Sequence, residues 1–231
     1  MADILETLRM EKKYLLNLSE RYAMDQKLSR VLREDSHNGT DGYVVRSLYF
    51  DTIDDSDFRD KEDGFEMRRK LRLRIYDVNA DTAKLELKEK QGEMQRKRSL
   101  LLSRCEAQYL CGGDYTPLLL KNSDFSLELY GRMMQFVYRP KCIVEYDRKA
   151  FSIEENSTRI TLDSNLRATE SDLDLFRERL NLNQAGVLQS CTLEVKYAHF
   201  LLSYIKDLVS STGRTQTSMS KYCAARDNSM G

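Results

Sequence analysis

Lysine, arginine and glutamate recur at every second position in several short runs of this sequence. In the run KLELKEK, Lys84, Glu86 and Lys88 share one face of an extended strand, because successive side chains of a strand point to opposite sides. Leucines occupy the other face. The same separation recurs with these residues on the charged face: Arg9, Glu11 and Lys13; Arg72 and Arg74; Tyr146 and Arg148; Arg159, Thr161 and Asp163; Glu194 and Lys196.

These residue types are suited to binding a chain of phosphate groups. The planar fork of arginine meets two phosphate oxygens at once, and lysine supplies a mobile positive charge. Carboxylates among such cations can hold Mg²⁺ or Mn²⁺, which take oxygen ligands and bridge phosphates. Two cations ~4 Å apart repel by about 4 kcal/mol at an effective dielectric constant of about 20, so a lining of this kind is hard to explain without an anionic ligand.

Two arrangements of the charged faces are open. Each face can be the solvated side of an antiparallel sheet, which is the usual arrangement for any one strand. Alternatively, helices cover the apolar faces from outside and the charged faces turn inward. The second arrangement is favoured because strand after strand carries Arg or Lys two residues from another charge, whereas a solvated face usually varies among Thr, Ser, Gln, Lys and Glu.

Eight alternating runs predict strands, which is enough to close a small barrel. They are Arg9–Asn17, Tyr43–Asp51, Arg69–Tyr76, Ala83–Lys90, Gln95–Ser103, Lys141–Ile153, Ser157–Leu162 and Thr192–Tyr197. Helical patterns lie at Ser19–Glu34, Asp54–Asp63, Ser123–Val137, Asp172–Leu180 and Ala198–Val209, with one or two further turns at Ser218–Arg226. The sequence therefore predicts an α+β fold in a single domain over residues 1–231, an antiparallel eight-stranded β-barrel with helices packed on the outside.

The composition excludes several classes of protein. Lys plus Arg and Asp plus Glu number 37 each, so there is no overall basic field of the kind that marks a nucleic-acid-binding protein. Five cysteines without CxxC spacing and only two histidines argue against a zinc site. The N-terminal residues lack an apolar signal core, and no run approaches the ~18 apolar residues that span a bilayer. We therefore expect a cytoplasmic protein with no membrane segment and no nucleic-acid partner.

The charged segments, taken in order, resemble the catalytic domain of the vacuolar transporter chaperone (VTC) family, the polyphosphate polymerases among the triphosphate tunnel metalloenzymes. The matching stretches read EKKYLL, SLYFDT, LRLRIYD, LELKEK, KRSLLL, VEYDRKAF, TRITLDSNL, TLEVKY and SMSKY. Each is only a charged strand and is weak by itself. Together they follow the order of the family over residues 9–226.

The resemblance implies a role for each matching residue. The catalytic phosphate contacts are Arg72, Arg74, Lys88, Arg148 and Arg159. Further phosphate-binding residues are Lys13, Lys97, Tyr146, Lys196, Ser220 and Lys221. Glu194 matches the metal-binding glutamate, with Glu86 as a second candidate ligand, and the implied cofactor is a divalent metal, Mn²⁺ or Mg²⁺. Whether Lys97 or Arg98 faces the tunnel depends on strand register, because a one-residue slip reverses the faces.

One position departs from the wider tunnel superfamily. Its ExExK strand reads Arg9, Glu11, Lys13 here, so an arginine replaces one glutamate. This change fits a basic polymerase tunnel better than a two-glutamate triphosphatase site. The regulatory domain that senses inositol phosphates and the membrane helices of eukaryotic VTC subunits are not recognisable, which favours a stand-alone, bacterial-type enzyme.

Three functions are compatible with these residues. The first is a polyphosphate polymerase that transfers the terminal phosphoryl group of ATP to a growing polyphosphate chain. The second is a triphosphatase of the same fold, in which water attacks a nucleoside or inorganic triphosphate. The third is a non-catalytic polyphosphate-binding module. Arg9 favours the first over the second, and the carboxylates of Glu194 and Glu86 would weaken a module that only binds anions.

Overall fold

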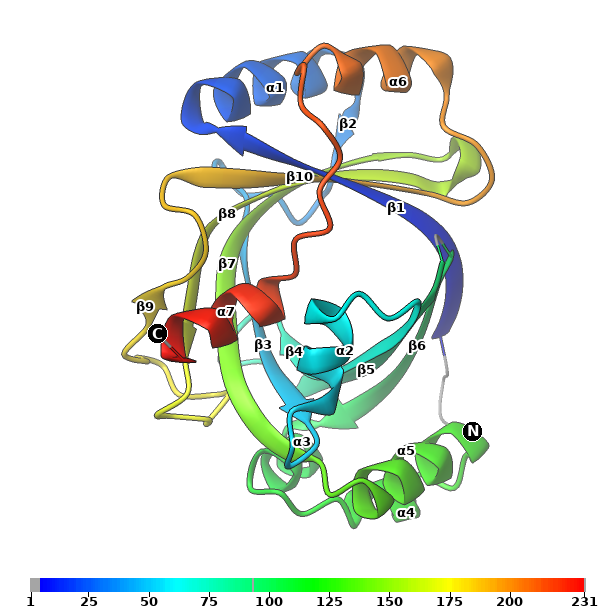
Figure 1. Ribbon diagram of the computed structural model, residues 1–231, viewed down its shortest axis with the longest axis vertical. Coiled ribbons are helices and arrows are strands. Elements are labelled where there is room, and N and C mark those ends of the chain that lie inside the picture. The colour runs from blue at the N-terminus through cyan, green and yellow to red at the C-terminus, as the bar shows by residue number, and fades with distance from the viewer. Residues whose placement is uncertain (1–4, 93, 231) are drawn as a thin grey trace.

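Eight antiparallel strands form a closed ring in the computed structural model, which describes residues 5–92 and 94–230 (Figure 1). In spatial order the ring contains β7 (Arg139–Ile153), β3 (Tyr43–Asp51), β4 (Met67–Ile75), β5 (Thr82–Gln91), β6 (Met94–Ser103), β1 (Leu5–Asn17), β10 (Ser190–Tyr197) and β8 (Thr158–Thr169). The pairing of β7 with β8 closes the ring. The short strands β2 (Arg33–Glu34) and β9 (Asn183–Gln184) extend the pairing beyond β7 and β8. The predicted eight-stranded barrel is confirmed.

The register of the strands brings opposite charges together on the inner face of the ring. Residues directly opposite each other in an antiparallel pair have Cβ atoms only about 4.5–5.5 Å apart, so their side chains interact. The facing pairs are Lys13 with Glu194, Glu11 with Lys196, Arg72 with Glu86, and Arg148 with Asp163. Because charged residues alternate along each strand, they share the inner face of the ring and line it with ion pairs.

The largest apolar cluster lies on the outer face of the ring. Outward leucines of β4, β5 and β6, including Leu73, Leu85 and Leu100, pack with Leu110 and Leu129. The last two belong to the helices on this side, α3 (Arg104–Cys111) and α5 (Asp124–Gln135), between which lies the short α4 (Pro117–Leu120). Helices that bury these leucines leave the opposite, charged faces of the same strands directed inward.

A second apolar cluster joins two helices to the other side of the ring. Helix α1 (Leu18–Val31) and helix α6 (Ser203–Ser210) pack beside each other over β1 and β10 (Figure 1). Buried Leu28 of α1 and Ile205 of α6 share this cluster with Val195 of β10. Asn17 ends β1 and begins α1 with a capping box, in which its side chain accepts from the Glu20 amide and Glu20 accepts from the Asn17 amide.

Asp51, at the end of β3, ties two further helices to one open end of the ring. Its buried carboxylate accepts the amides of Asp57 and Phe58, both at 2.9 Å, in the first turn of α2 (Ser56–Glu62). The same carboxylate accepts the hydroxyl of Tyr222 at 2.7 Å, near the start of α7 (Lys221–Met230). This arrangement holds the residues that begin α7 against the interior of the barrel.

The structure differs from the predicted helices in several places. The segment predicted as a helix at Asp172–Leu180 is irregular, since Asp172 and Asp174 accept nearby backbone amides and form turns. Helices α3 and α4 were not predicted, α1 ends at Val31 rather than Glu34, and α6 begins at Ser203 rather than Ala198. Over the described residues, none of the helices has the length and apolar character needed to cross a membrane.

Candidate functional site

Three adjoining cavities occupy the interior of the barrel. The large cavity has a volume of about 680 Å³ and is bordered by Arg9, Arg159 and other residues of the strands. The central cavity has about 70 Å³, and a third, of about 260 Å³, is bordered by Lys61 of α2 and is named here the α2 cavity. Lys88 lines all three, and each pair of cavities shares further residues. We refer to the three together as the tunnel.

The segment between α6 and α7 crosses one open end of the ring (Figure 1). Gln216, Thr217 and Met219 of this segment border the α2 cavity. The amide of Thr217 donates to the carbonyl of Lys13 at 2.9 Å, which attaches the segment to β1. The crossing segment therefore brings Ser220 and Lys221, which follow it, into the central cavity.

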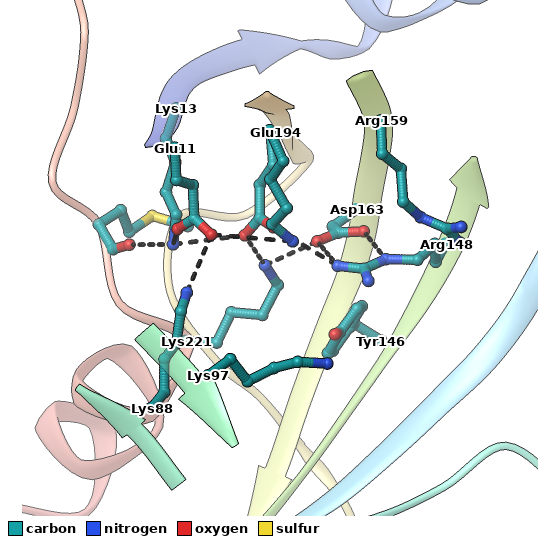
Figure 2. Close-up of polar contacts among 12 residues, drawn as sticks. Glu11, Lys13, Lys88, Lys97, Tyr146, Arg148, Arg159, Asp163, Glu194 and Lys221 are labelled. Atoms are coloured by element: carbon teal, nitrogen blue, oxygen red, sulfur yellow. Dashed lines mark hydrogen bonds and ion pairs between the residues drawn. The ribbon is translucent and has the colours of Figure 1, made fainter. Parts of the chain in front are cut away.

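Glu194 is the centre of the ion pairs in the tunnel (Figure 2). Its carboxylate lies 2.8 Å from the amine of Lys221, 2.9 Å from that of Lys196 and 3.3 Å from that of Lys13. The guanidinium of Arg148 lies 3.6 Å away. Burial alone would raise the pKa of Glu194, but these cations hold the pKa well below its usual range. Glu194 is therefore ionised in the folded protein.

Asp163 continues this row of charges toward β7. It accepts two hydrogen bonds from Arg148, from Nε and from Nη2, each at 2.7 Å, and it lies 2.7 Å from the amine of Lys221. Figure 2 shows Glu11, Glu194 and Asp163 in one row, joined by the amines of lysine residues and the guanidinium of Arg148. Arg148 was expected to donate two hydrogen bonds to phosphate oxygens, but in the structure it donates them to the two oxygens of Asp163. Only Nη1 of its guanidinium lies outside this pair.

A second cluster forms around Glu86 in the large cavity. Its carboxylate lies 2.8 Å from Arg72, 3.1 Å from Lys97 and 3.6 Å from Arg74. Desolvation would raise the pKa of Glu86, but the neighbouring cations keep the pKa well below its usual range. Glu86 thereby holds three cations at one wall of the cavity.

Lys97 and Arg98 take opposite directions from β6. Lys97 lines the large cavity and pairs with Glu86, whereas Arg98 lies outside the ring, where it pairs with Glu89 at 3.1 Å and stacks on Phe125 at 4.6 Å from the ring centre. The uncertainty of register left by the sequence is therefore settled: Lys97 is the inward residue.

Three arginines of the large cavity also donate hydrogen bonds to tyrosine hydroxyls, and one of them pairs with a further carboxylate. Arg72 donates to Tyr49 and Arg74 donates to Tyr146, both at 3.2 Å. Arg159, at the wall of the large cavity, donates to Tyr43 at 3.0 Å and pairs with Asp35 at 2.7 Å. Because these hydrogen bonds restrict the long side chains, less conformational entropy is lost when an anion binds.

Comparison with known proteins places this arrangement in a family. The family model described as the VTC domain matches residues 8–229, nearly the whole chain. The chain belongs to the VTC domain family. A comparison with curated protein sequences finds no match.

The VTC-domain chain shares its fold with solved structures of low sequence identity. A candidate adenylyl cyclase from Hippeastrum, described as having a dominant triphosphatase activity, is 15% identical, with 97% of this chain and 96% of that chain covered and a TM-score of 0.56. A candidate adenylate cyclase from Bacillus halodurans is 14% identical, with 93% and 95% covered and a TM-score of 0.54. At these identities the likeness establishes the fold.

The VTC fold brings every predicted site residue to the tunnel. The arginines and lysines named from the sequence line its cavities, together with Tyr146, Ser220, Glu86 and Glu194. The tunnel residues that were not singled out as site residues include Glu11 and Lys70, and Asp163, which pairs with the lining residues Arg148 and Lys221, was also missed. The signal for all three was present, since Glu11 and Lys70 lie two residues from the predicted Lys13 and Arg72, and Asp163 lies four residues from Arg159 on the same strand face.

The carboxylates of the VTC tunnel fit a divalent metal in part. Mg²⁺ and Mn²⁺ are commonly held by one or two carboxylates together with phosphate oxygens of the substrate. Glu11 and Glu194 share the amines of Lys13 and Lys196 and are therefore neighbours, whereas Glu86 pairs with other cations. Among the described residues, no group of three or more His, Cys, Asp or Glu side chains is arranged to hold a metal by itself. A metal here would need the phosphates to complete its coordination.

Proposed function

We propose that this VTC-domain protein is a polyphosphate polymerase, which transfers the terminal phosphoryl group of ATP to a polyphosphate chain inside the tunnel. The observation that carries the proposal is the continuity of the three cavities, whose lining cations extend from Arg159 past Lys88 to Lys61. One triphosphate would occupy part of this length. The remainder can hold the acceptor chain in line with the donor phosphate, which raises its effective concentration over that of water.

Different residues of the tunnel bind different phosphates, according to their position. Arg72, Arg74, Lys88, Arg148 and Arg159 neutralise the oxygens of the transferring phosphate and of the phosphates beside it. Lys13, Lys97, Tyr146, Lys196, Ser220 and Lys221 hold the remaining phosphates of donor and acceptor. Because the carboxylates already position most of these cations, little reorganisation accompanies the build-up of negative charge in the transition state.

A divalent metal completes the proposed site. Glu194 and Glu11 are the residues that would hold Mn²⁺ or Mg²⁺, since they adjoin each other and remain ionised. When bound, the metal would neutralise part of the negative charge of the phosphates. Glu86 pairs with three other cations, none of which it shares with Glu194 or Glu11, so it is better suited to holding Arg72 and Lys97 in place than to joining this metal site.

The product formed from ATP tests the proposal directly. We expect incubation with ATP and Mn²⁺ or Mg²⁺ to release ADP and to give a ladder of long polyanions on a gel, with little free phosphate early in the reaction. The triphosphatase of similar fold from Hippeastrum makes hydrolysis the second candidate. Phosphate released mole for mole with ADP, with no ladder even after addition of a short polyphosphate primer, would establish hydrolysis instead. Absence of both products would favour a module that only binds polyphosphate.

A tunnel lined with cations should also stabilise the fold when a polyanion binds. At a concentration of tripolyphosphate one hundred times its Kd, mass action contributes about 2.7 kcal/mol to the free energy of unfolding. Thermal unfolding followed by circular dichroism should therefore show a higher Tm with tripolyphosphate than with chloride at matched ionic strength. The same Tm in both salts would contradict the assignment of the tunnel as an anion site.

A further inference from the structure

Lys70 differs from the other cations of the central cavity. Those cations are Lys13, Arg72, Arg74, Lys88, Arg148, Lys196 and Lys221. Each of them forms an ion pair with Glu11, Glu86, Asp163 or Glu194. Over the residues that the structure describes, Lys70 forms no such pair. Its amine instead donates to the hydroxyl of Ser220, immediately before α7.

The groups that face Lys70 are mostly cationic. Lys88 lies directly opposite on β5, Lys13 faces it from β1 and Lys61 faces it from α2, while α7 contributes the thiol of Cys223. Glu11 lines the same α2 cavity, but its two oxygens are engaged by Lys13 at 3.2 Å and Lys88 at 2.9 Å. Within the part of the chain that the structure describes, the Lys70 amine therefore lies among positive charges without a carboxylate to compensate it.

Burial and these neighbours change the acidity of Lys70. Desolvation, followed by the charges of Lys13, Lys88 and Lys61, lowers the pKa of Lys70 from its usual value to about 7. Lys221 lines the same central cavity, but the charges of Asp163 and Glu194 outweigh its burial and raise its pKa. The difference between the two lysines follows from the presence or absence of a carboxylate partner.

We propose that Lys70 binds a phosphate group of the polyanion in the tunnel and takes up a proton from solvent as it does so. A phosphate in the central or α2 cavity would supply the negative charge that Lys70 lacks, without displacing a carboxylate. The amine accepts one proton to become an ammonium ion, and no other bond changes. The inference rests on the proposed function only in that a polyphosphate anion occupies the tunnel, and it is independent of the transfer chemistry.

Calorimetry with inorganic tripolyphosphate measures this proton. Titrations in buffers of different ionisation enthalpy give the number of protons taken up on binding. The matched variant is Lys70→Arg, whose guanidinium stays charged, so proton changes of the tripolyphosphate itself are common to both proteins. With the free amine at a pKa of about 7, wild type should take up about 0.9 proton more than Lys70→Arg at about pH 8, and about 0.1 more at about pH 6.

The affinities provide a second readout. Below a pKa of about 7 the amine is already protonated, whereas above it each binding event must first recruit a proton. The affinity of wild type relative to Lys70→Arg should therefore fall about tenfold from about pH 6 to about pH 8. Lys121→Arg, at a lysine outside the barrel that pairs with Glu106 at 2.7 Å, should behave as wild type in both measurements.

The outcomes separate this inference from the proposed function. Equal proton uptake at about pH 8 in wild type and Lys70→Arg, with tripolyphosphate bound by both, would overturn the role of Lys70 and leave the anion tunnel intact. Failure of wild type to bind tripolyphosphate would overturn both. Lys70→Met, which removes the amine, gives the same comparison of proton uptake if the arginine variant does not fold.

Discussion

Glu194→Gln should destabilise the anion-free protein by about 3–5 kcal/mol, the usual loss when one partner of a buried ion pair is removed. Residue Glu194 is 4% exposed, and its carboxylate lies between Lys13, Lys196, Lys221 and Arg148. The amide of glutamine keeps the shape of the side chain but leaves these cations to repel one another. Chemical denaturation without phosphate or polyphosphate measures the change in the free energy of unfolding.

A polyanion should restore much of the stability that this variant loses. Tripolyphosphate supplies negative charge to the cations that Glu194 no longer compensates, so it should raise the Tm of Glu194→Gln more than that of wild type. Glu145→Gln is the matched control, since Glu145 is also buried and paired with Arg46 at 2.7 Å and Arg167 at 3.0 Å, but it does not line the tunnel. That variant should lose stability without an enhanced response to tripolyphosphate.

Turnover of Glu194→Gln should fall strongly while binding of tripolyphosphate is kept or becomes tighter. The lost carboxylate is one of the two proposed metal ligands, and its removal also takes a negative charge from a site that receives a polyanion. ADP release measured against metal concentration is the appropriate assay. Wild-type turnover with unchanged metal dependence would contradict the role of Glu194 as a ligand.

The strand faces were predictable because one physical rule determines them. A period of two assigns Arg72, Lys88 and Glu194 to the same faces as their neighbours at i±2, and covering the leucines with helices determines which face is inside. The adjacent basic residues Lys97 and Arg98 could not be distinguished in this way, because a run with both faces polar has no apolar partner to fix its register. The structure distinguishes them through Glu86 and Phe125.

The partners across the ring could not be predicted. The alternation indicates that Glu11, Glu86 and Glu194 face inward, but it contains no information on which strands become neighbours. The pairing of β1 with β10 brings Glu11, rather than the predicted Glu86, beside Glu194. The alternation places Lys70 on the face of Arg72, although the LRLRIYD stretch begins only at Leu71, but the contact of the Lys70 amine with Ser220 on a distant segment could not be predicted.

Arg148→Lys should reduce kcat by about 100-fold, comparable to the removal of one well-placed donor from a charge-stabilising site. In the structure, Nε and Nη2 of Arg148 donate hydrogen bonds to Asp163, and the side chain of Arg148 lines both the large and the central cavity. The fixed fork therefore orients the remaining Nη1 group, which a lysine amine cannot reproduce because it offers a single point of charge. The conservative change keeps the charge and loses this orientation.

The folded state should tolerate Arg148→Lys, because Asp163 keeps its ion pair with Lys221 at 2.7 Å. The loss should thus appear in kcat, measured as ADP release at saturating ATP, with only a small change in Tm. Arg167→Lys is the control: Arg167 pairs with Glu145 and Asp147 away from the tunnel, so this variant should turn over as wild type does. Full turnover by a folded Arg148→Lys protein would mean that the guanidinium of Arg148 serves to hold Asp163 and does not contact the reacting phosphate.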